Sequence, residues 1–431
     1  MSLGSNSRFN SVSTCMKGLL YTLTVGAVAI WVMFGTEVGF CEQKRVVLDW
    51  HNDAAWHKPG QEVLGKVGLE QMNIGVQSTF YPDTSAYQAQ MRLALTSEKA
   101  PALFDWWFGY RMRDLIKAGL VADLTSIWEK HIANGEYERS LISSFGYNGK
   151  FYALPKMINY YVVLYNRGVF AQYGLQIPET WSEFIGLMEE LKSLGIIPVS
   201  LPTAQGSWTS MLWFGELMVR YDPQLYVELM DGKIKYNDPR VIEVMEIWKD
   251  MLEKGYIGGF GLTLDTLAKA FAQNEVGMTF LGDWWIPIAA TQGYEDLGMF
   301  IMPGITEKGK KSLIIEGRPT LLGAKSPYLK QALEFADYVM SVPGSTLLAE
   351  AQGINSANLK VAGSTRPPLL RKLNDEVSAG KYVLYTRYWE ATPSAVVEEV
   401  VELLMKFILH PETLREVLDE ATKIADSYWA K

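Results

Sequence analysis

Cysteine is nearly absent from this chain of 431 residues: there are two, Cys15 and Cys41, and both lie in the first 41 residues. A domain built from the remaining residues cannot contain an internal disulfide, so its stability must come from its hydrophobic core. Histidine is also scarce, with four residues, and none belongs to an HExxH motif. We therefore expect neither a transition metal nor a cofactor.

Several motifs of catalysis and nucleotide binding are missing as well. The chain has no GxSxG motif, no phosphate-binding P-loop and no GxGxxG after its first predicted strand. Basic residues are fewer than acidic residues, 40 against 48, which gives a formal net charge of −8. A surface for nucleic acid or for an anionic membrane requires a clustered basic face. The sequence therefore favours a binding protein over an enzyme and excludes nucleic acid as the expected partner.

Long apolar runs are confined to the N-terminus, where residues 18–34 follow two basic residues. This stretch is too short for a typical membrane span and is typical of the apolar part of a signal peptide. We expect residues 1–41 to direct export to an extracytoplasmic location. The sequence Val38-Gly39-Phe40-Cys41 leaves two alternatives. It resembles a lipoprotein box with a bulky residue in a small position, which predicts a lipid anchor at Cys41, or it marks ordinary cleavage after Cys41.

Aromatic residues, in contrast, are abundant, with 14 tryptophans and 22 tyrosines. Their rings combine a flat apolar face with a polar edge, which suits the apolar faces and hydroxyl rims of sugars. Most aromatic side chains of a globular protein lie in its core, so the excess alone does not define a site. The length of the chain and its 48% hydrophobic content predict two lobes, each with its own core.

Short apolar runs alternate with amphipathic segments along the chain. Arg45–Asp49 and Pro101–Phe104 are predicted strands, and a helix capped by Asp83 lies between them. This alternation predicts an α/β fold with a mostly parallel sheet and right-handed crossovers. An Asn148-Gly149 turn predicts a hairpin, and the apolar run Asn159–Asn166 predicts a strand that leads into the second lobe. In that lobe we expect helices that begin at Thr180 and Asp238 and a strand at Val276–Phe280.

A carboxylate and a pair of tryptophans follow two of these strands. Asp105-Trp106-Trp107 comes directly after one strand, and Asp283-Trp284-Trp285 follows the strand at residues 276–280. Ligands of open α/β sheets bind beyond the carboxyl ends of the strands, so we predict that the two groups form opposite walls of one cleft. Adjacent side chains of an extended chain point to opposite sides. We therefore expect one tryptophan of each pair to reach the cleft and the other to lie in the core.

The order of these landmarks resembles that of the family 1 extracellular solute-binding proteins, the sugar-binding components of ABC importers. The resemblance covers nearly the whole chain after residue 41. The matching segments are Tyr87–Met91, Ala100-Pro101, Phe104-Asp105, Leu115–Leu124, Gly149–Pro155, Leu164–Asn166, Thr180–Phe184 and Met278–Trp284. The chain departs from the family at Leu281, where an asparagine often precedes the glycine.

This resemblance implies a two-lobed periplasmic-binding-protein fold of type II, in which the sugar is enclosed when the lobes close about a hinge. Crossing segments are expected near residues 159–162, 302–313 and 361–365. They give an N-terminal lobe of residues 42–160 and 313–362 and a C-terminal lobe of residues 161–312 and 363–431. The protein would act as a monomer whose closed form is recognised by a membrane permease. Its contact with the membrane would be through the permease or a lipid anchor only.

The resemblance also implies further binding residues. Trp50 and His51 resemble the first binding loop of the family, and Trp389 corresponds to an aromatic contact of its C-terminal segment. Arg318 would donate paired hydrogen bonds to sugar hydroxyls. The alternatives are structural, namely lobe packing for Trp50 and His51 and a surface ion pair for Arg318.

The predicted ligand is a neutral mono- or oligosaccharide, and two alternatives stay open. A protein of the same fold could bind a non-sugar solute, such as a peptide or a compound like glycerol phosphate. A glycoside hydrolase would instead use Asp105 and Asp283 as an acid/base pair, with carboxyl groups about 5 to 10 Å apart.

Overall fold

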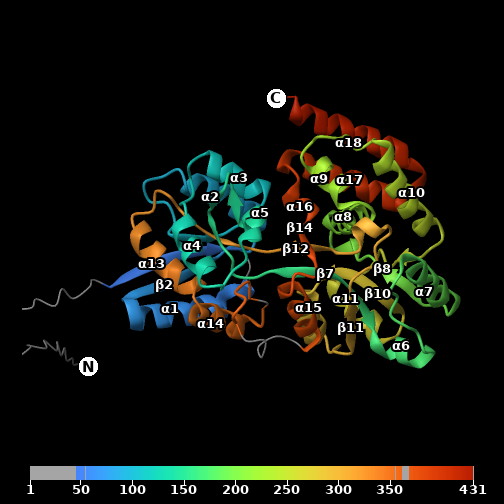
Figure 1. The fold of residues 1–431 in the computed structure, drawn as a ribbon, viewed down its shortest axis with the longest axis horizontal. Coiled ribbons are helices and arrows are strands. Elements are labelled where there is room, and N and C mark those ends of the chain that lie inside the picture. Colours follow the sequence, from blue (N-terminus) through green and yellow to red (C-terminus); the bar gives the residue numbers. More distant parts are fainter. Residues whose placement is uncertain (1–44, 54, 355, 362–367, 431) are drawn as a thin grey trace, which may run out of the picture. The chain divides into compact units, whose positions relative to one another are not determined.

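The computed structural model describes residues 45–53, 55–354, 356–361 and 368–430 (Figure 1). The predicted signal peptide and Cys41 lie outside these ranges. All the elements below belong to the unit that begins at Lys44. Within the described part of the chain, no helix has both the length and the apolarity needed to cross a membrane.

The first lobe is built on a five-stranded sheet with the strand order β2-β1-β3-β13-β6. β1 runs parallel to β2 and β3, whereas β13 runs antiparallel to β3 and β6. The strands are β1 (Val46–Asn52), β2 (Ile74–Phe80), β3 (Leu103–Asp105), β6 (Ala153–Leu154) and β13 (Thr320–Leu322). The helices of this lobe are α1 (Lys58–Met72), α2 (Thr84–Ala94), α3 (Tyr110–Lys117), α4 (Thr125–Ala133), α5 (Ile142–Phe145), α13 (Leu329–Met340) and α14 (Val342–Gln352).

The second lobe is built on a seven-stranded sheet with the order β14-β12-β7-β10-β8-β9, in which β11 also pairs with β7. Its strands are β7 (Asn159–Asn166), β8 (Ile197–Ser200), β9 (Ile257–Gly258), β10 (Val276–Gly282), β11 (Leu297–Phe300), β12 (Ser312–Glu316) and β14 (Val383–Thr386). Helices cover it, and they are α6 (Arg167–Tyr173), α7 (Trp181–Ser193), α8 (Ser210–Tyr221), α9 (Pro223–Met230), α10 (Pro239–Glu253), α11 (Leu264–Ala272), α12 (Trp285–Thr291), α15 (Pro368–Ser378), α16 (Tyr388–Ala391), α17 (Ser394–Leu409) and α18 (Leu414–Trp429). Both sheets have helices on their faces, as an α/β fold requires (Figure 1).

The chain passes between the two sheets several times (Figure 1). One passage joins β6 to β7, and another joins β12 to β13 across residues 317–319. A third lies between α14 and α15 and includes residues outside the described ranges. β12 pairs with β7 and β14 of the second sheet, so the change of sheet follows residue 316. The lobe boundaries given above stay predictions.

Local sequence signals account for many of these elements. The predicted strand Asn159–Asn166 is confirmed as β7, and the predicted turn is confirmed because Asn148 and Gly149 both have positive φ between β4 (Gly146–Tyr147) and β5 (Lys150–Phe151). The capping box of Thr180 is confirmed at the start of α7. The expectation that β1 ends at Asp49 is wrong. β1 continues to Asn52 because Thr79 and Phe80 extend β2 and provide it with a hydrogen-bonding partner.

A buried carboxylate joins the elements of the first lobe. Asp105, at the end of β3, is fully buried and accepts four hydrogen bonds. The donors are Trp50 Nε1 at 2.9 Å, Thr320 Oγ1 at 2.6 Å, Lys156 Nζ at 2.6 Å and His57 Nδ1 at 2.5 Å. Since a buried charge is stable only when it is paired and hydrogen-bonded, this network fixes β1, β13, the start of α1 and the passage from β6 to β7 around one side chain.

Burial and charge shift the pKa values of this network in a consistent direction. Burial would raise the pKa of Asp105, but the neighbouring Lys156 and His57 hold it well below its usual range. Burial, together with the positive charge of Lys156, lowers the pKa of His57 to about 4. The network at neutral pH therefore contains a carboxylate, an ammonium group and a neutral imidazole.

The two lobes are in contact at Gly109, the residue before α3. Gly109 has φ 67° and ψ −140°, a conformation that residues with a side chain rarely adopt. A Cβ atom at this position would overlap the main-chain carbonyl of Glu390 in α16 of the second lobe. Glycine is therefore required here for both backbone conformation and space.

We predict that His57 makes the folded protein sensitive to acid. A histidine whose pKa is lower in the folded state contributes stability above its unfolded pKa of about 6.5, and this contribution is lost as the pH falls toward 4. The free energy of unfolding should drop by about 2 kcal/mol between pH 7 and pH 5 from this group alone. Urea denaturation of the wild type and of His57→Gln measures the effect. The slope with pH should be shallower in His57→Gln and unchanged in His410→Gln, a control at an exposed position. Equal slopes for all three proteins would contradict this assignment.

We also predict that Gly109→Ala destabilises the protein by at least about 3 kcal/mol, because backbone strain and overlap with Glu390 add to each other. Gly119→Ala is the matched control. Gly119 has the same φ of 67°, and a Cβ atom there would meet nothing within 4 Å, so it should cost only about 1–2 kcal/mol. Thermal and urea unfolding of both variants test this difference. Similar losses of stability would show that contact with Glu390 has no energetic effect.

Candidate functional site

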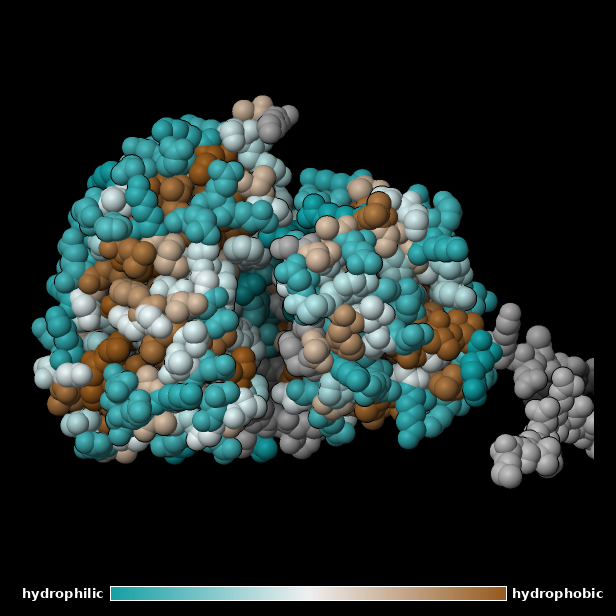
Figure 2. Space-filling view, turned by 180° about the vertical axis from the view of Figure 1, so that it is seen from behind, coloured by the Kyte–Doolittle hydropathy of each residue, from teal (hydrophilic) through white to brown (hydrophobic). Residues whose placement is uncertain are grey.

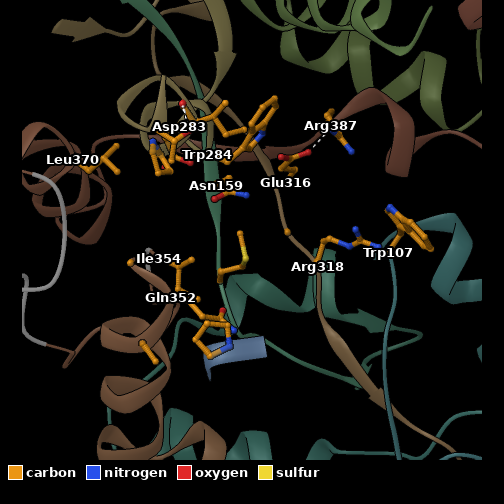
Figure 3. Close-up of a pocket in the computed structure, with 18 of the residues that line it drawn as sticks. Trp107, Asn159, Asp283, Trp284, Glu316, Arg318, Gln352, Ile354, Leu370 and Arg387 are labelled. Atoms are coloured by element: carbon orange, nitrogen blue, oxygen red, sulfur yellow. Dashed lines mark hydrogen bonds and ion pairs between the residues drawn. The ribbon is translucent and has the colours of Figure 1, made fainter. Parts of the chain in front are cut away.

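A cavity of about 670 Å³ lies between the two lobes. Both lobes contribute walls to it, and the surface is visibly hollowed between them (Figure 2). The volume falls within the range of about 300–1,000 Å³ that is usual for cavities that enclose small molecules. This cavity is the candidate site, and Figure 3 shows the side chains around it.

Charged and amide side chains line much of this cavity, and we call six of them the polar lining. They come from the ends of strands, where the backbone leaves the sheet and side chains become available to a ligand. Asn159 begins β7, Glu316 ends β12, and Asp283 directly follows β10. The other members, which come from the loops beside these strands and from α16, are Arg318, Arg387 and Glu390.

Arg387 is held by two carboxylates. Its guanidinium group pairs with Glu316 and with Glu390, and the Nε–Oε2 distance to Glu390 is 2.9 Å. Its Nη1 also donates to the hydroxyl of Tyr161 at 2.7 Å, and that hydroxyl lies 3.0 Å from Glu316 Oε2. Burial disfavours the charge of Arg387, but the two carboxylates outweigh this effect and hold its pKa well above the usual value. The pKa of Glu316 is raised, mainly by burial. Arg387 therefore stays charged, and its cluster forms a fixed wall.

Arg318 is oriented differently. Its guanidinium group pairs with Asp53 of the first lobe and lies 4.5 Å from the ring centroid of Trp107. This cation–π contact fixes the plane of the group. Arg318 Nε is buried and finds no hydrogen-bond acceptor among the described residues. The same is true of Trp284 Nε1 within the described ranges. Both residues line the cavity, but these two N–H groups are themselves buried.

The two tryptophan pairs divide as adjacent residues should. Trp107 and Trp284 line the cavity, whereas Trp106 and Trp285 are fully buried. Trp106 Nε1 donates to the carbonyl of Arg111 at 3.1 Å, which ties it to α3. Trp285 Nε1 donates to the carbonyl of Leu264 at 3.1 Å. Gly282 makes the orientation of Trp284 possible, because a side chain at residue 282 would overlap the indole.

Four other residues that the sequence places in the cleft lie away from the cavity lining. Trp50 is fully buried and Asp105 forms the network of the first lobe. His51 lies between Asp49 and Tyr81, with ring nitrogens 3.0 and 2.9 Å from their side-chain oxygens. Trp389 is partly buried, with the Arg111 guanidinium 5.2 Å from its ring centroid. Since Asp105 is enclosed by its four donors, it cannot face Asp283 across the cavity as the acid/base pair of a glycoside hydrolase.

Several cavity residues were missed at the level of sequence. In the segment after β14 the sequence points to Trp389, but Arg387 and Glu390 face the cavity instead. A signal did exist, because residues three apart in the first turn of a helix share one face, and an Arg–Glu pair at this spacing can meet. Asn159 and the aliphatic lining residues belong to no recognisable sequence motif, so the sequence did not predict that they line the cavity.

A metal site is not indicated by the structure. No group of three or more histidine, cysteine, aspartate and glutamate side chains in the described part of the chain is arranged to hold a metal ion. The carboxylates of the cavity are instead placed beside guanidinium groups. The arrangement is suited to hydrogen bonding of an organic ligand.

Comparison with known proteins connects this geometry to a family. The family model described as bacterial extracellular solute-binding protein matches residues 50–344. The multiple sugar-binding protein of Streptococcus mutans is 23% identical, over 87% of this chain and 90% of its own length. An uncharacterized ABC transporter extracellular-binding protein of Pyrococcus horikoshii is also 23% identical, over 95% of this chain and 96% of its own.

Solved structures show the same two-lobed α/β fold. The bacterial solute receptor AcbH, which has a preference for β-D-galactopyranose, has a TM-score of 0.77 and 21% identity, with 89% of this chain and 99% of that chain covered. RafE in complex with raffinose has a TM-score of 0.68 and 20% identity, with 88% and 99% covered. The predicted fold class is thereby confirmed. Because the family model covers most of the chain, this protein belongs to the bacterial extracellular solute-binding proteins.

Proposed function

We propose that this protein is the substrate-binding component of an ABC importer and that it binds a neutral mono- or oligosaccharide in the cavity between its lobes. The observation that carries this proposal is a cavity wall on which two tryptophans, Trp107 and Trp284, stand beside carboxylates and guanidinium groups. A hydroxyl group both donates and accepts hydrogen bonds. A ligand with several hydroxyls matches a wall on which donors and acceptors alternate.

The charge of the cavity favours a neutral ligand over an anionic one. Its lining contains three carboxylates, from Asp283, Glu316 and Glu390, and two guanidinium groups, from Arg318 and Arg387. Both guanidinium groups already pair with carboxylates. An anion would meet repulsion without a cation to compensate it. This argues against a solute like glycerol phosphate and against a peptide bound through its terminal carboxylate.

The names of related proteins support a sugar. The relatives include a multiple sugar-binding protein and a diacetylchitobiose-binding protein, and the solved structures include a complex with raffinose. We propose that Trp107, Asp283, Trp284 and Arg318 contact the sugar directly. Trp50, His51, Asp105, Trp106, Trp285 and Trp389 would support these residues from behind.

Transport would follow from closure of the lobes about the crossing segments, which a sugar bound to both walls stabilises. The partner would be the membrane permease of the importer, which distinguishes the closed form from the open one. Export by the N-terminal segment, with cleavage or lipid attachment at Cys41, would place the protein outside the cytoplasm. The protein would act as a monomer without a cofactor.

A panel of mono- and oligosaccharides tests this function. A ligand that binds only the folded state raises the melting temperature, and calorimetry then gives the dissociation constant. Chromatography of a bound oligosaccharide after incubation for hours should recover it intact. Absence of any shift across the panel would contradict sugar binding, and release of shorter products would contradict a transport role.

We predict that Trp284→Ala weakens binding of the sugar found in this panel by about 30-fold or more. The substitution removes both an aromatic wall and a donor, and loss of a central aromatic contact typically costs at least about 2 kcal/mol. The melting temperature should change little, because Trp284 is only partly buried. Trp181→Ala, at a partly buried tryptophan of α7 outside the cavity, should leave the affinity unchanged. Unchanged affinity in Trp284→Ala would remove this residue from the site.

We predict that Arg318→Lys weakens binding of the same sugar by roughly tenfold or more. Lysine keeps the charge beside Asp53 but lacks Nε and the planar geometry that Trp107 fixes, and a hydrogen bond from a charged group contributes about 1.5–3 kcal/mol. Calorimetry on the purified variant measures the loss. Arg240→Lys, at an arginine on the surface of α10, is the control and should bind like the wild type. Equal affinity of both variants would show that Nε has no ligand acceptor.

A further inference from the structure

The start of α3 contacts the second lobe through three consecutive residues. Gly109 lies against the main chain of α16, and the two helices are neighbours (Figure 1). Tyr110 packs edge-on against Trp429, the last residue of α18, with ring centroids 6.3 Å apart. Arg111 Nη2 donates to Glu398 Oε1 of α17 at 2.8 Å. One short segment of the first lobe therefore meets three helices of the second.

Arg111 is the most enclosed of these contacts, with 3% of its side chain exposed. Its guanidinium group lies 5.8 Å from the ring centroid of Trp107 and 5.2 Å from that of Trp389. Both distances are within the range of about 6 Å in which a cation is attracted to the face of an aromatic ring. Trp107 belongs to the first lobe, and Trp389 and Glu398 belong to the second. The guanidinium group of Arg111 therefore interacts with both lobes.

Trp107 connects Arg111 with the cavity. The Trp107 ring lines the cavity and has a second guanidinium neighbour, Arg318, at 4.5 Å from its centroid. Arg111 itself is not among the residues that line the cavity. A sugar that stacks on Trp107 would therefore meet a ring that Arg111 helps to orient, without a direct contact to Arg111.

The contact between Arg111 and Glu398 depends on how the lobes are placed. The chain itself joins the lobes in the passages between β6 and β7, between β12 and β13 and between α14 and α15. Rotation about these passages changes the distance between Arg111 and Glu398. When the lobes separate, Arg111 loses this carboxylate. Gln88 Oε1 of its own lobe lies 3.4 Å from Nη1, which is too long for a strong hydrogen bond. The pair with Glu398 therefore favours the form in which the lobes touch.

We propose that Arg111 is a positioning residue for sugar binding, which sets the affinity by holding the second lobe against the first. A sugar between Trp107 of the first lobe and Trp284 of the second needs both walls within reach. The apparent affinity falls in proportion to the fraction of molecules in the form that can bind. Arg111 and Glu398 increase that fraction. This inference rests on the proposed function, because it assigns the cavity to a sugar.

Small-angle X-ray scattering of the sugar-free protein tests the pair by itself. Arg111→Met and Glu398→Gln remove the pair from opposite lobes, and each should have a larger radius of gyration than the wild type. The Glu398 side chain is 58% exposed, so its variant is expected to fold even if Arg111→Met does not. Glu129→Gln, which breaks a pair with Arg139 inside the first lobe, is the control and should scatter as the wild type does. An unchanged radius in Glu398→Gln would overturn the inference.

Calorimetry then measures the effect on binding, with the saccharide of the panel that binds the wild type most tightly. Glu398→Gln should weaken binding by about threefold and Arg111→Met by about tenfold, because the second change also removes the contacts with two aromatic rings. The double variant should resemble Arg111→Met, since both changes break the same pair. Losses that multiply in the double variant would overturn the inference. Tighter binding in Glu398→Gln would also overturn it, because the pair would then favour separated lobes.

The two measurements separate failure of this inference from failure of the proposed function. If a saccharide binds the wild type and Glu398→Gln equally well, the proposed function stands and the role of Arg111 is refuted. If no saccharide of the panel binds the wild type, the proposed function fails, and the role of Arg111 in binding fails with it. Scattering needs no sugar and would still show whether Arg111 and Glu398 hold the lobes together.

Discussion

The fold of the first lobe depends on the pairing of one buried carboxylate. Asp105 cannot be exchanged for a neutral side chain without leaving Lys156 as a buried, unpaired cation, and such a cation is costly. The same carboxylate receives donors from β1, from β13 and from the start of α1. Lys156 lies in the passage between the sheets, so this electrostatic pairing also fixes where the chain leaves the first lobe. The cavity residues Met157 and Asn159 lie one and three residues after Lys156, so the pairing of Lys156 also helps to position them.

Two clusters of charged side chains, around Arg387 and around Arg318, border the cavity and have different structural roles. The Arg387 cluster lies within the second lobe and connects β12 with the segment after β14 through side chains, beside the main-chain hydrogen bond that Arg387 N donates to the carbonyl of Ile315 at 3.0 Å. Arg318 lies in the passage on the side of the first lobe, where it pairs with Asp53 and contacts the ring of Trp107. Only one residue, Gly317, separates Glu316 from Arg318 along the chain. The short passage between β12 and β13 therefore has a charged residue on each side of Gly317: Glu316 pairs within the second lobe, and Arg318 pairs with the first. A ligand that contacts both Glu316 and Arg318 is in contact with the hinge.

Local patterns in the sequence predicted the strands and the capped helices. They also predicted that one tryptophan of each pair faces the cleft. Such features depend on residues that are neighbours in the chain. The capping box at Thr180 and the alternation at Trp106 and Trp107 are of this kind. The position of Asp105 at the end of a predicted strand suggested a ligand-binding residue. Its side chain instead contacts Lys156, His57 and Thr320, which are distant in sequence. The aliphatic residues of the cavity lining were not predicted for the same reason. They come from separate helices, and no short segment contains the pattern that they form together.

Some residues of the cavity lining depend on one another and others do not, and this difference has a consequence for how such a protein changes over evolutionary time. Glu316, Arg387, Glu390 and Tyr161 depend on one another, so a single substitution among them leaves charged groups without partners. Ile288, Ile354 and Leu370 have aliphatic side chains that need no charged partner. Each can be exchanged for another aliphatic residue with a small loss of stability. A change of ligand is therefore easiest through substitution of the aliphatic lining residues one at a time, while the network of charged residues is retained.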